Sequence, residues 1–310
     1  MTARPDVSVI IPTRNRARSL ERLLASIGAL READPPRAEF LFVDNGSTDG
    51  TGALLQREAR REARFRMKVI EEPRPGKSNA LNRGLAEAEG GIVILIDDDV
   101  VVDPAWLVSH WQFHLASGFA VAQGRVLAGT DPQGRPADPA RLREYNIPIV
   151  DYGPEAREIR GFTGTNVSLD RRVVEVVGKF NPWLGPGASG YSEDTEYSRR
   201  IRAAGFRIGY APGAVVFHEL DPERYGRAYH RLTEYRKGLS RSLYRRESLW
   251  LRILPDLAVN CMRYGVYRAL GRVQKAYRTE GRIMKRLGEL HGRWRGAGSR
   301  GPSGEGEAKR

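Results

Sequence analysis

The chain has 310 residues, of which 40% are hydrophobic and 29% are charged, and its formal net charge is +13. This length allows one large α/β domain with an appendage or two modest domains. The charged fraction argues against a membrane-embedded protein. The single cysteine excludes a disulfide framework or a multi-cysteine zinc site. Residues 221–310 hold 22 basic and 9 acidic side chains, so the whole charge excess lies in the last ninety residues.

The amino terminus enters an apolar segment without the basic region, long apolar segment and cleavage site of a signal peptide. No run approaches the roughly 18 apolar residues of a membrane-spanning helix. We therefore expect a protein of the reducing cytoplasm.

Two strand–helix units are predicted at the start of the chain. Residues 7–12 form an apolar strand, and residues 18–30 have the apolar spacing of an amphipathic helix. Residues 40–43 predict a second strand, which leads into the Ser-, Thr- and Asp-rich loop 44–51. This loop could be only a capped turn, but Asp44 stands at the carboxyl end of a strand, where open α/β sheets bind ligands.

A third unit comprises a helix through Arg66, a short strand over residues 68–70 and a helix over residues 79–89. The loop 73–79 lacks the glycine spacing of a Walker motif, so Lys77 is a candidate anion contact and no more. Three such units predict a mostly parallel sheet of the nucleotide-binding type.

Three consecutive carboxylates follow the next strand. Residues 92–96 are an unbroken, mostly β-branched apolar run, which predicts a strand buried on both faces, and Asp97, Asp98 and Asp99 come directly after it. Adjacent carboxylates repel one another unless a cation or solvent offsets the repulsion, and their hard oxygen atoms suit Mg²⁺ or Mn²⁺. The alternative is a solvated acidic turn before the helix that begins near Pro104.

More strands and helices are expected after Pro104. The strands cover residues 119–124, 161–169, 206–210 and 214–218, and the helices cover residues 105–117, 171–177 and 193–204. Between them, residues 129–160 and 180–190 are rich in proline and glycine and show no period, which suggests mobile or substrate-facing segments.

Two further acids and a histidine stand at element ends. Glu193 and Asp194 lie in the first turn of a predicted helix, where the helix dipole favours acids whatever their function. His218 ends the last predicted strand, and a lone histidine is more often structural than a ligand.

In this order the motifs resemble the inverting glycosyltransferase family 2. The resemblance covers roughly residues 6–220 and is carried by segments 7–15, 44–51, 76–84, 97–99 (Asp-Asp-Asp), 164–166 (Gly-Thr-Asn), 190–205 and 216–219 (Val-Phe-His-Glu). It implies an α/β protein with the GT-A fold, in which a mostly parallel, mixed sheet is flanked by helices. It also implies a metal-dependent transferase that moves a sugar from a nucleotide-sugar to an acceptor hydroxyl, in bacterial cell-surface polysaccharide or glycoconjugate synthesis.

The resemblance also implies which residues hold the donor. The base and the ribose would contact Pro12, Thr13, Asn15 and Asp44. Lys77 would lie near the ribose or the phosphates. Many relatives carry an acid where this chain has Asn45, and we expect that change to have a small effect on base recognition. The motifs leave UDP-, GDP- and dTDP-sugars open.

The metal and the base are assigned by the same resemblance. Asp97 would face the ribose and Asp99 the Mg²⁺ or Mn²⁺ ion, Asp98 could share either role, and His218 could approach the diphosphate or the metal. Asp194 would be the general base, with Glu193 about 100° away around the helix.

This chemistry is consistent with physical expectation. The departing diphosphate builds negative charge that a divalent cation neutralises, and the acceptor hydroxyl loses its proton to a carboxylate on the opposite face of the sugar. One base without a covalent intermediate gives inversion. A sugar nucleotidyltransferase is the alternative enzyme, but the turn 13–16 lacks its glycine-rich basic loop. A non-catalytic nucleotide-sugar binding module is disfavoured by the intact Asp97, Asp99 and Asp194.

The rest of the chain is expected to differ from the transferase domain over residues 1–220. Residues 221–295 predict a basic helical extension, and residues 296–310 have a disordered composition. The residues Val259, Met262, Val266, Leu270, Val273 and Tyr277 fall at helical spacing. This stripe could pack on the transferase domain, or residues 221–290 could lie peripherally on an anionic membrane. No nucleic-acid partner is expected, because no recognised module accompanies the charge.

Overall fold

The structure is a computed structural model that describes residues 4–31, 33, 36–61, 64–131, 133–138 and 142–298. It divides into two compact units, one made of Met1–Ala188 and Glu193–Tyr225, the other of Ser189–Ser192 and Gly226–Arg310. Most of the tail with disordered composition, residues 299–310, lies outside the described residues, whereas residues 296–298 end a helix.

The first four strands of the first unit are parallel and lie in the order β3-β2-β1-β4. They form because their sequences are apolar runs: every residue of β1 and of β4 is buried, as a sheet covered on both faces requires. The strands are β1 (Val7–Thr13), β2 (Ala38–Asp44), β3 (Arg66–Glu71) and β4 (Ile92–Ile96).

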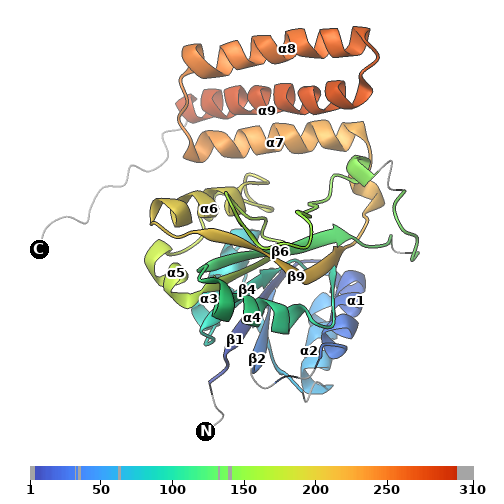
Figure 1. Ribbon diagram of the computed structural model, residues 1–310, viewed down its shortest axis with the longest axis vertical. Coiled ribbons are helices and arrows are strands. Elements are labelled where there is room, and N and C mark those ends of the chain that lie inside the picture. Colours follow the sequence, from blue (N-terminus) through green and yellow to red (C-terminus); the bar gives the residue numbers. More distant parts are fainter. Residues whose placement is uncertain are drawn as a thin grey trace, which may run out of the picture. The chain divides into compact units, whose positions relative to one another are not determined.

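Helices cover both faces of this sheet (Figure 1). Apolar side chains of α1 (Ala17–Gly28), α2 (Thr51–Arg61) and α4 (Trp106–Ser117) join the hydrophobic core on one face. Those of α3 (Lys77–Glu87), α5 (Arg171–Val177) and α6 (Glu193–Ala203) join the core on the other. The α/β architecture predicted from the sequence is therefore present.

The remaining strands make the sheet mixed. β8 (Asn166–Asp170) is antiparallel between β4 and β6 (Val121–Ala128), and β9 (Ile208–His218) runs parallel to β6. The register of the β6–β9 pair shifts between Gly124 and Arg125, so the two short strands expected over residues 206–218 are one irregular strand.

A short strand links the acidic segment to the far edge of the sheet. β5 (Val100–Val102) pairs antiparallel with the end of β9, whereas β4 lies several strands away along the path β4-β8-β6-β9-β5. Only residues 97–99 separate β4 from β5, and such a link can span only about 14 Å. The sheet must therefore curl until the end of β4 lies beside the β5–β9 pair.

Some element boundaries differ from the sequence prediction. The helix expected through Arg66 ends at Arg61, and Arg66 begins β3; nearby, Phe65 packs edge-on against Phe40 of β2 with ring centroids 5.1 Å apart. The segment 129–160 contains a 3₁₀ turn (Leu142–Tyr145) and β7 (Arg157–Ile159), which pairs with the start of β9.

The second unit is a set of helices in which α9 (Val273–Gly298) packs against both α7 (Arg227–Tyr244) and α8 (Leu254–Ala269), as Figure 1 shows. A π-helical turn (Leu249–Ile253) leads into α8, and Pro255 is tolerated in the first turn of that helix. The apolar residues expected to share one helix face over residues 259–277 do not do so, because the chain turns at Gly271 with φ +64°. No helix in the described part of the chain is both long and apolar enough to cross a membrane.

Candidate active site

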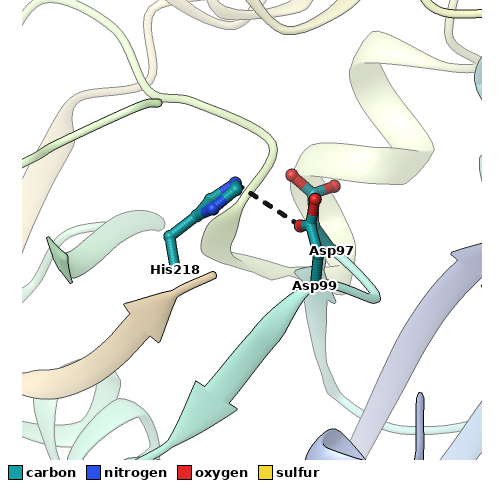
Figure 2. Close-up of side chains that lie close together, drawn as sticks. All are labelled: Asp97, Asp99 and His218. Atoms are coloured by element: carbon teal, nitrogen blue, oxygen red, sulfur yellow. Dashed lines mark ion pairs between the residues drawn. The ribbon is translucent and has the colours of Figure 1, made fainter. Parts of the chain in front are cut away.

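Three predicted metal ligands come together where β4, β5 and β9 meet. One ligand atom from each of Asp97, Asp99 and His218 lies within 4.8 Å of the others, and Figure 2 shows the His218 ring turned toward Asp99. His218 Nε2 is 3.4 Å from Asp99 Oδ1. The pairing of β5 with β9 brings His218 to this place, because Val100 and His218 are partners in that ladder.

The donor set suits a divalent cation. His218 Nδ1 is 2.8 Å from the Glu219 carbonyl oxygen, which can only accept a hydrogen bond, so Nδ1 carries the proton and Nε2 keeps a lone pair when the ring is neutral. Asp99 is buried, and its Oδ1 makes no hydrogen bond among the described residues. A buried carboxylate oxygen without a donor is costly unless a cation binds it. These residues therefore fit Mg²⁺ or Mn²⁺.

The middle acid depends on its neighbours. Burial, and then the charge of Asp99, raise the pKa of Asp98 to about 7, although Arg16 opposes the shift. The Arg16 guanidinium is 4.0 Å from Asp98 and 3.8 Å from Asp99. The Asp98 carboxyl group therefore resists ionisation beside Asp99, and added positive charge would relieve this.

Two arginines that sequence reasoning did not identify lie at this cluster. Arg16 follows the turn after β1, and Arg224 lies in the 3₁₀ turn Pro222–Arg224 with a nitrogen 3.3 Å from Asp99. Arg224 also pairs with Asp221 at 3.2 Å. Arg16 was close to a recognised motif, but no spacing in the sequence connects Arg224 with Asp99.

Lys77 contacts the cluster from the start of α3. Its Nζ pairs with Asp97 and is 3.8 Å from Glu193. Burial alone would lower the pKa of Lys77, but the charges of Asp97, Glu193 and Asp194 and the hydrogen bond to Asp97 raise it. Burial would raise the pKa of Asp97, but Lys77 outweighs it and the pKa falls. The Thr165 hydroxyl also donates to Asp97 at 2.9 Å. Lys77 and Asp97 are therefore both held in their charged forms.

Glu193 and Asp194 lie in different surroundings at the start of α6. Glu193 is buried beneath Gly185, where an added Cβ would be 3.1 Å from its carboxylate, and burial followed by the charge of Asp194 raises its pKa to about 7. Asp194 is less buried and accepts hydrogen bonds from the backbone N–H groups of Gly164 at 3.3 Å and Thr195 at 2.6 Å. Two backbone donors therefore fix the position of the Asp194 carboxylate.

The residues predicted to hold the nucleoside lie at the ends of β1 and β2. Pro12 and Thr13 are buried opposite Val43 and Asp44 in the ladder. Asn15, with φ +53°, accepts a hydrogen bond from the Thr48 backbone N–H at 2.7 Å. Asp44 accepts from the Ser47 N–H at 2.9 Å. In this structure Asn15 and Asp44 thus shape the loop 44–51.

Asn45 ties two loops together. Its amide nitrogen donates to the carbonyls of Glu72 and Arg74 at 2.8 and 2.7 Å, and its oxygen accepts from the Gly76 N–H at 2.8 Å. A carboxylate here could accept but could not donate. The amide therefore fixes the loop that leads into Lys77.

The segment 184–188 closes over the start of α3. The N–H of Lys77 donates to the Pro186 carbonyl at 2.9 Å, and the Ser78 hydroxyl donates to that of Leu184 at 2.7 Å. A Cβ on Gly187 would lie 2.8 Å from Gly76 Cα, so this approach requires glycine. The irregular segment predicted over 180–190 is thus anchored beside Lys77.

This chain is similar in sequence and in fold to known proteins. The family model for glycosyl transferase family 2 matches residues 8–178. The chain is 25% identical over 246 residues to the probable glycosyltransferase YdaM of Bacillus subtilis, covering 76% of this chain and 55% of YdaM. It is 27% identical over 219 residues to the glycosyltransferase AglE of Haloferax volcanii, covering 70% of this chain and 68% of AglE. Its fold is similar to that of a mannosyltransferase from Pyrobaculum calidifontis solved with GDP-Man and Mn²⁺, with a TM-score of 0.61 at 22% identity over 95% of this chain and 88% of that one.

Proposed function

This chain belongs to glycosyltransferase family 2, and from that premise we propose that it transfers a sugar, with inversion, from a nucleoside-diphosphate sugar to an acceptor hydroxyl. The predicted GT-A fold and transferase class are confirmed. The observation that carries the proposal is the cluster of Asp97, Asp99 and His218 beside the carboxyl end of β4. The mannosyltransferase of similar fold, which holds GDP-Man and Mn²⁺, supports it.

A divalent cation, Mg²⁺ or Mn²⁺, would be held by Asp99 with Asp97 and His218, and when bound it would supply positive charge for the departing diphosphate. Arg16 and Arg224 stand beside the same carboxylates and present guanidinium groups suited to phosphate oxygens. These two arginines would turn from Asp99 to the phosphates when the donor binds. They would orient the leaving group and stabilise its charge.

Lys77 would act from the other side of the cluster. Because the pKa of Lys77 is raised, its ammonium is charged at any working pH. It pairs with Asp97, which would face the ribose, and so keeps this carboxylate ionised as an acceptor for a ribose hydroxyl. Pro12, Thr13, Asn15 and Asp44 would line the place of the base and the ribose, and Asp98 would share the ribose or the metal.

Asp194 would remove the acceptor proton. It is the more accessible acid of the pair, and two backbone N–H groups hold its carboxylate in position. A positioned carboxylate can take the proton of an attacking hydroxyl. Glu193 is buried against Lys77 and Gly185, which suits it to positioning Lys77 rather than to meeting an acceptor.

Several finer assignments are part of the same proposal. The transferase domain covers residues 1–220 and the basic helical extension residues 221–295. The acceptor is a glycan, lipid-linked or small-molecule hydroxyl in bacterial cell-surface polysaccharide or glycoconjugate synthesis. The protein works in the cytoplasm, peripherally on the inner face of the membrane, a position that the positive charge of residues 221–310 supports.

The variant Asp99→Asn tests the proposal. It should lose Mn²⁺-dependent binding of nucleoside diphosphate, measured by calorimetry with and without EDTA, and should keep its far-ultraviolet circular dichroism spectrum. Asp103→Asn is the matched control, because Asp103 directly follows β5 as Asp99 directly precedes it, and its carboxylate lies outside the cluster. Tight, EDTA-insensitive binding by Asp99→Asn would contradict the metal assignment. Thermal shifts with a series of UDP-, GDP- and dTDP-sugars would identify the donor.

A further inference from the structure

Helix α8 exposes apolar side chains on its outer side. Met262 is 66% exposed, and Val259 and Val266 are also exposed at the i, i+3 and i+7 positions of one helix face. Leu270, just after the helix, extends this face, so that the four lie within an arc of about 80°. Leu251, 80% exposed, and Trp250 lie in the π-helical turn before α8. We call these six residues, Trp250, Leu251, Val259, Met262, Val266 and Leu270, the apolar stripe.

Three polar side chains of α8, those of Asp256, Asn260 and Tyr264, are engaged within its own unit. Asp256 pairs with Arg286 of α9 at 2.7 Å, and the Tyr264 hydroxyl accepts a hydrogen bond from Arg227 of α7 at 2.7 Å. Asn260 is buried and donates to the Asp256 carbonyl. The helix therefore departs from the usual surface arrangement, in which the apolar face is buried and the polar face is in water. Exposed apolar side chains gathered in this way mark a binding site.

Arginines border the apolar stripe. Arg252, Arg263, Arg268 and Arg272 are exposed, and none of them forms an ion pair with another described residue. In the segment 245–275 the acids are Glu247 and Asp256, and both already pair with Arg286. Arg263 lies about 60° and Arg268 about 160° from the middle of this arc, and Arg252 and Arg272 lie near the two ends of the stripe in the chain. The surface thus has an apolar centre and an uncompensated positive border.

We propose that α8 and the π-helical turn before it bind the surface of an anionic lipid bilayer, with the apolar stripe at the acyl boundary and the arginines at the headgroups. An interfacial helix of this composition lies in the plane of the membrane and buries its apolar face. Trp250 suits the boundary between headgroups and acyl chains. This assigns membrane contact to residues 250–272 rather than to residues 221–290 as a whole, and it does not depend on sugar transfer.

Charge distinguishes the bilayer from other occupants of the stripe. A second copy of α8 would bring its own arginine border against this one, and like charges at close range oppose that pairing. A nucleic acid would contact the arginines but would leave the apolar centre exposed to water. An anionic bilayer matches both the centre and the border.

The test uses the full chain and vesicles of phosphatidylcholine with about one-third phosphatidylglycerol, at low salt. Co-sedimentation should be strong with these vesicles and weak with phosphatidylcholine alone. Met262→Asp with Val266→Asp should lower the partition coefficient at least about tenfold, because binding scales with buried apolar area. Leu115→Asp is the matched control, since Leu115 is 68% exposed on α4, which belongs to the other unit. It should bind like the parent.

A spectroscopic measurement reports contact directly. Vesicles should shift the tryptophan emission of the parent to shorter wavelength, and Trp250→Phe should remove most of that shift while Trp183→Phe should keep it. The proposal is overturned if the parent ignores anionic vesicles, or if Met262→Asp with Val266→Asp binds them like the parent. Self-association that the double variant abolishes, measured without lipid by light scattering, would also overturn it in favour of a second copy.

Discussion

Neighbouring residues in this site have unlike chemistry because each meets different atoms. Glu193 and Asp194 are adjacent, yet burial raises the pKa of Glu193 to about 7, whereas Asp194 receives backbone N–H donors. From the residues alone, both were acids at a helix start, and only the family resemblance assigned the base to Asp194. The difference depends on the segments of Gly164 and Gly185, which only tertiary structure brings to α6.

Asp194→Asn should lower turnover by about 10²–10⁴-fold, the usual contribution of a general base. Donor affinity should hardly change, because the base contacts the acceptor and not the nucleotide. Steady-state kinetics with a separate measurement of donor binding will distinguish the two effects. Glu193→Gln is the control and should be milder. Near-normal turnover in Asp194→Asn with none in Glu193→Gln would reverse the two roles.

A second feature at the level of single residues is a network of two histidines between α4 and β8. Asn166 accepts from Trp106 and lies 2.9 Å from His110, while Ser168 lies between His110 and His114 at 2.9 and 2.8 Å. Burial lowers the pKa of His110 to about 3 and that of His114 to about 4. Both therefore stay neutral in the folded protein at pH values where an unfolded chain would protonate them.

This network should make the protein acid-sensitive. Below about pH 6.5 the histidines of the unfolded chain take up protons that those of the folded chain do not. The contribution of His110 and His114 to the free energy of unfolding is therefore fully present above that pH and is lost as the pH drops toward 4. Each histidine contributes a slope of up to about 1.4 kcal/mol per pH unit. Urea unfolding between pH 7 and pH 5 should show a smaller slope for His114→Gln than for the parent. Equal slopes would contradict this account.

At the scale of elements, the sequence predicted the helices and strands that have a clear apolar pattern. The helix over 171–177 has the predicted bounds, and β1 and β4 are the expected apolar strands. β5 and β7 were missed, because three-residue strands are too short to show a period and depend on their partner β9. The sequence placed Tyr277 on the same helix face as Met262. In the structure Gly271 breaks the helix, and Tyr277 stacks on His230 with ring centroids 4.0 Å apart.

Helices α7 and α9 should depend on glycine where their backbones approach. A Cβ on Gly288 would overlap the Tyr235 carbonyl oxygen, whereas nothing lies within 4 Å of a Cβ on Gly265 of α8. Gly288→Ala should therefore destabilise the protein by about 1–3 kcal/mol or more. Gly265→Ala should stabilise it by about 0.5–1 kcal/mol, because alanine is the better helix former. Urea unfolding followed by circular dichroism measures both, and similar effects for the two variants would refute the proposed close approach.

At the scale of the whole molecule, the site combines segments from the whole length of the first unit. Sequence reasoning found most of the acids and Lys77, because each stands at the end of an element. It could not find Arg224, which reaches Asp99 from a turn more than a hundred residues later. It also could not show that Asn45 fastens the loop before Lys77.

Donor binding should therefore protect scattered segments at once. With Mn²⁺ and the nucleoside diphosphate that binds, hydrogen exchange should slow over residues 13–16, 44–51, 74–78, 97–99, 163–166 and 216–224. It should stay unchanged in α8, where the apolar stripe serves a different partner. Mass spectrometry of the full chain measures this, with Asp99→Asn as the control that shows no protection. Protection confined to α8 would place the donor elsewhere.

Because only three residues link β4 to β5, metal binding would also affect the stability of the β5–β9 pair. Asp97 and Asp99 are near neighbours in the chain, but His218 lies more than a hundred residues farther on. A cation held by all three would close that long loop as a reversible cross-link, and closing a long loop removes more chain entropy than closing a short one. Part of its binding energy would then oppose local opening of the β5–β9 pair. Chelation would loosen this corner of the sheet even with no substrate present.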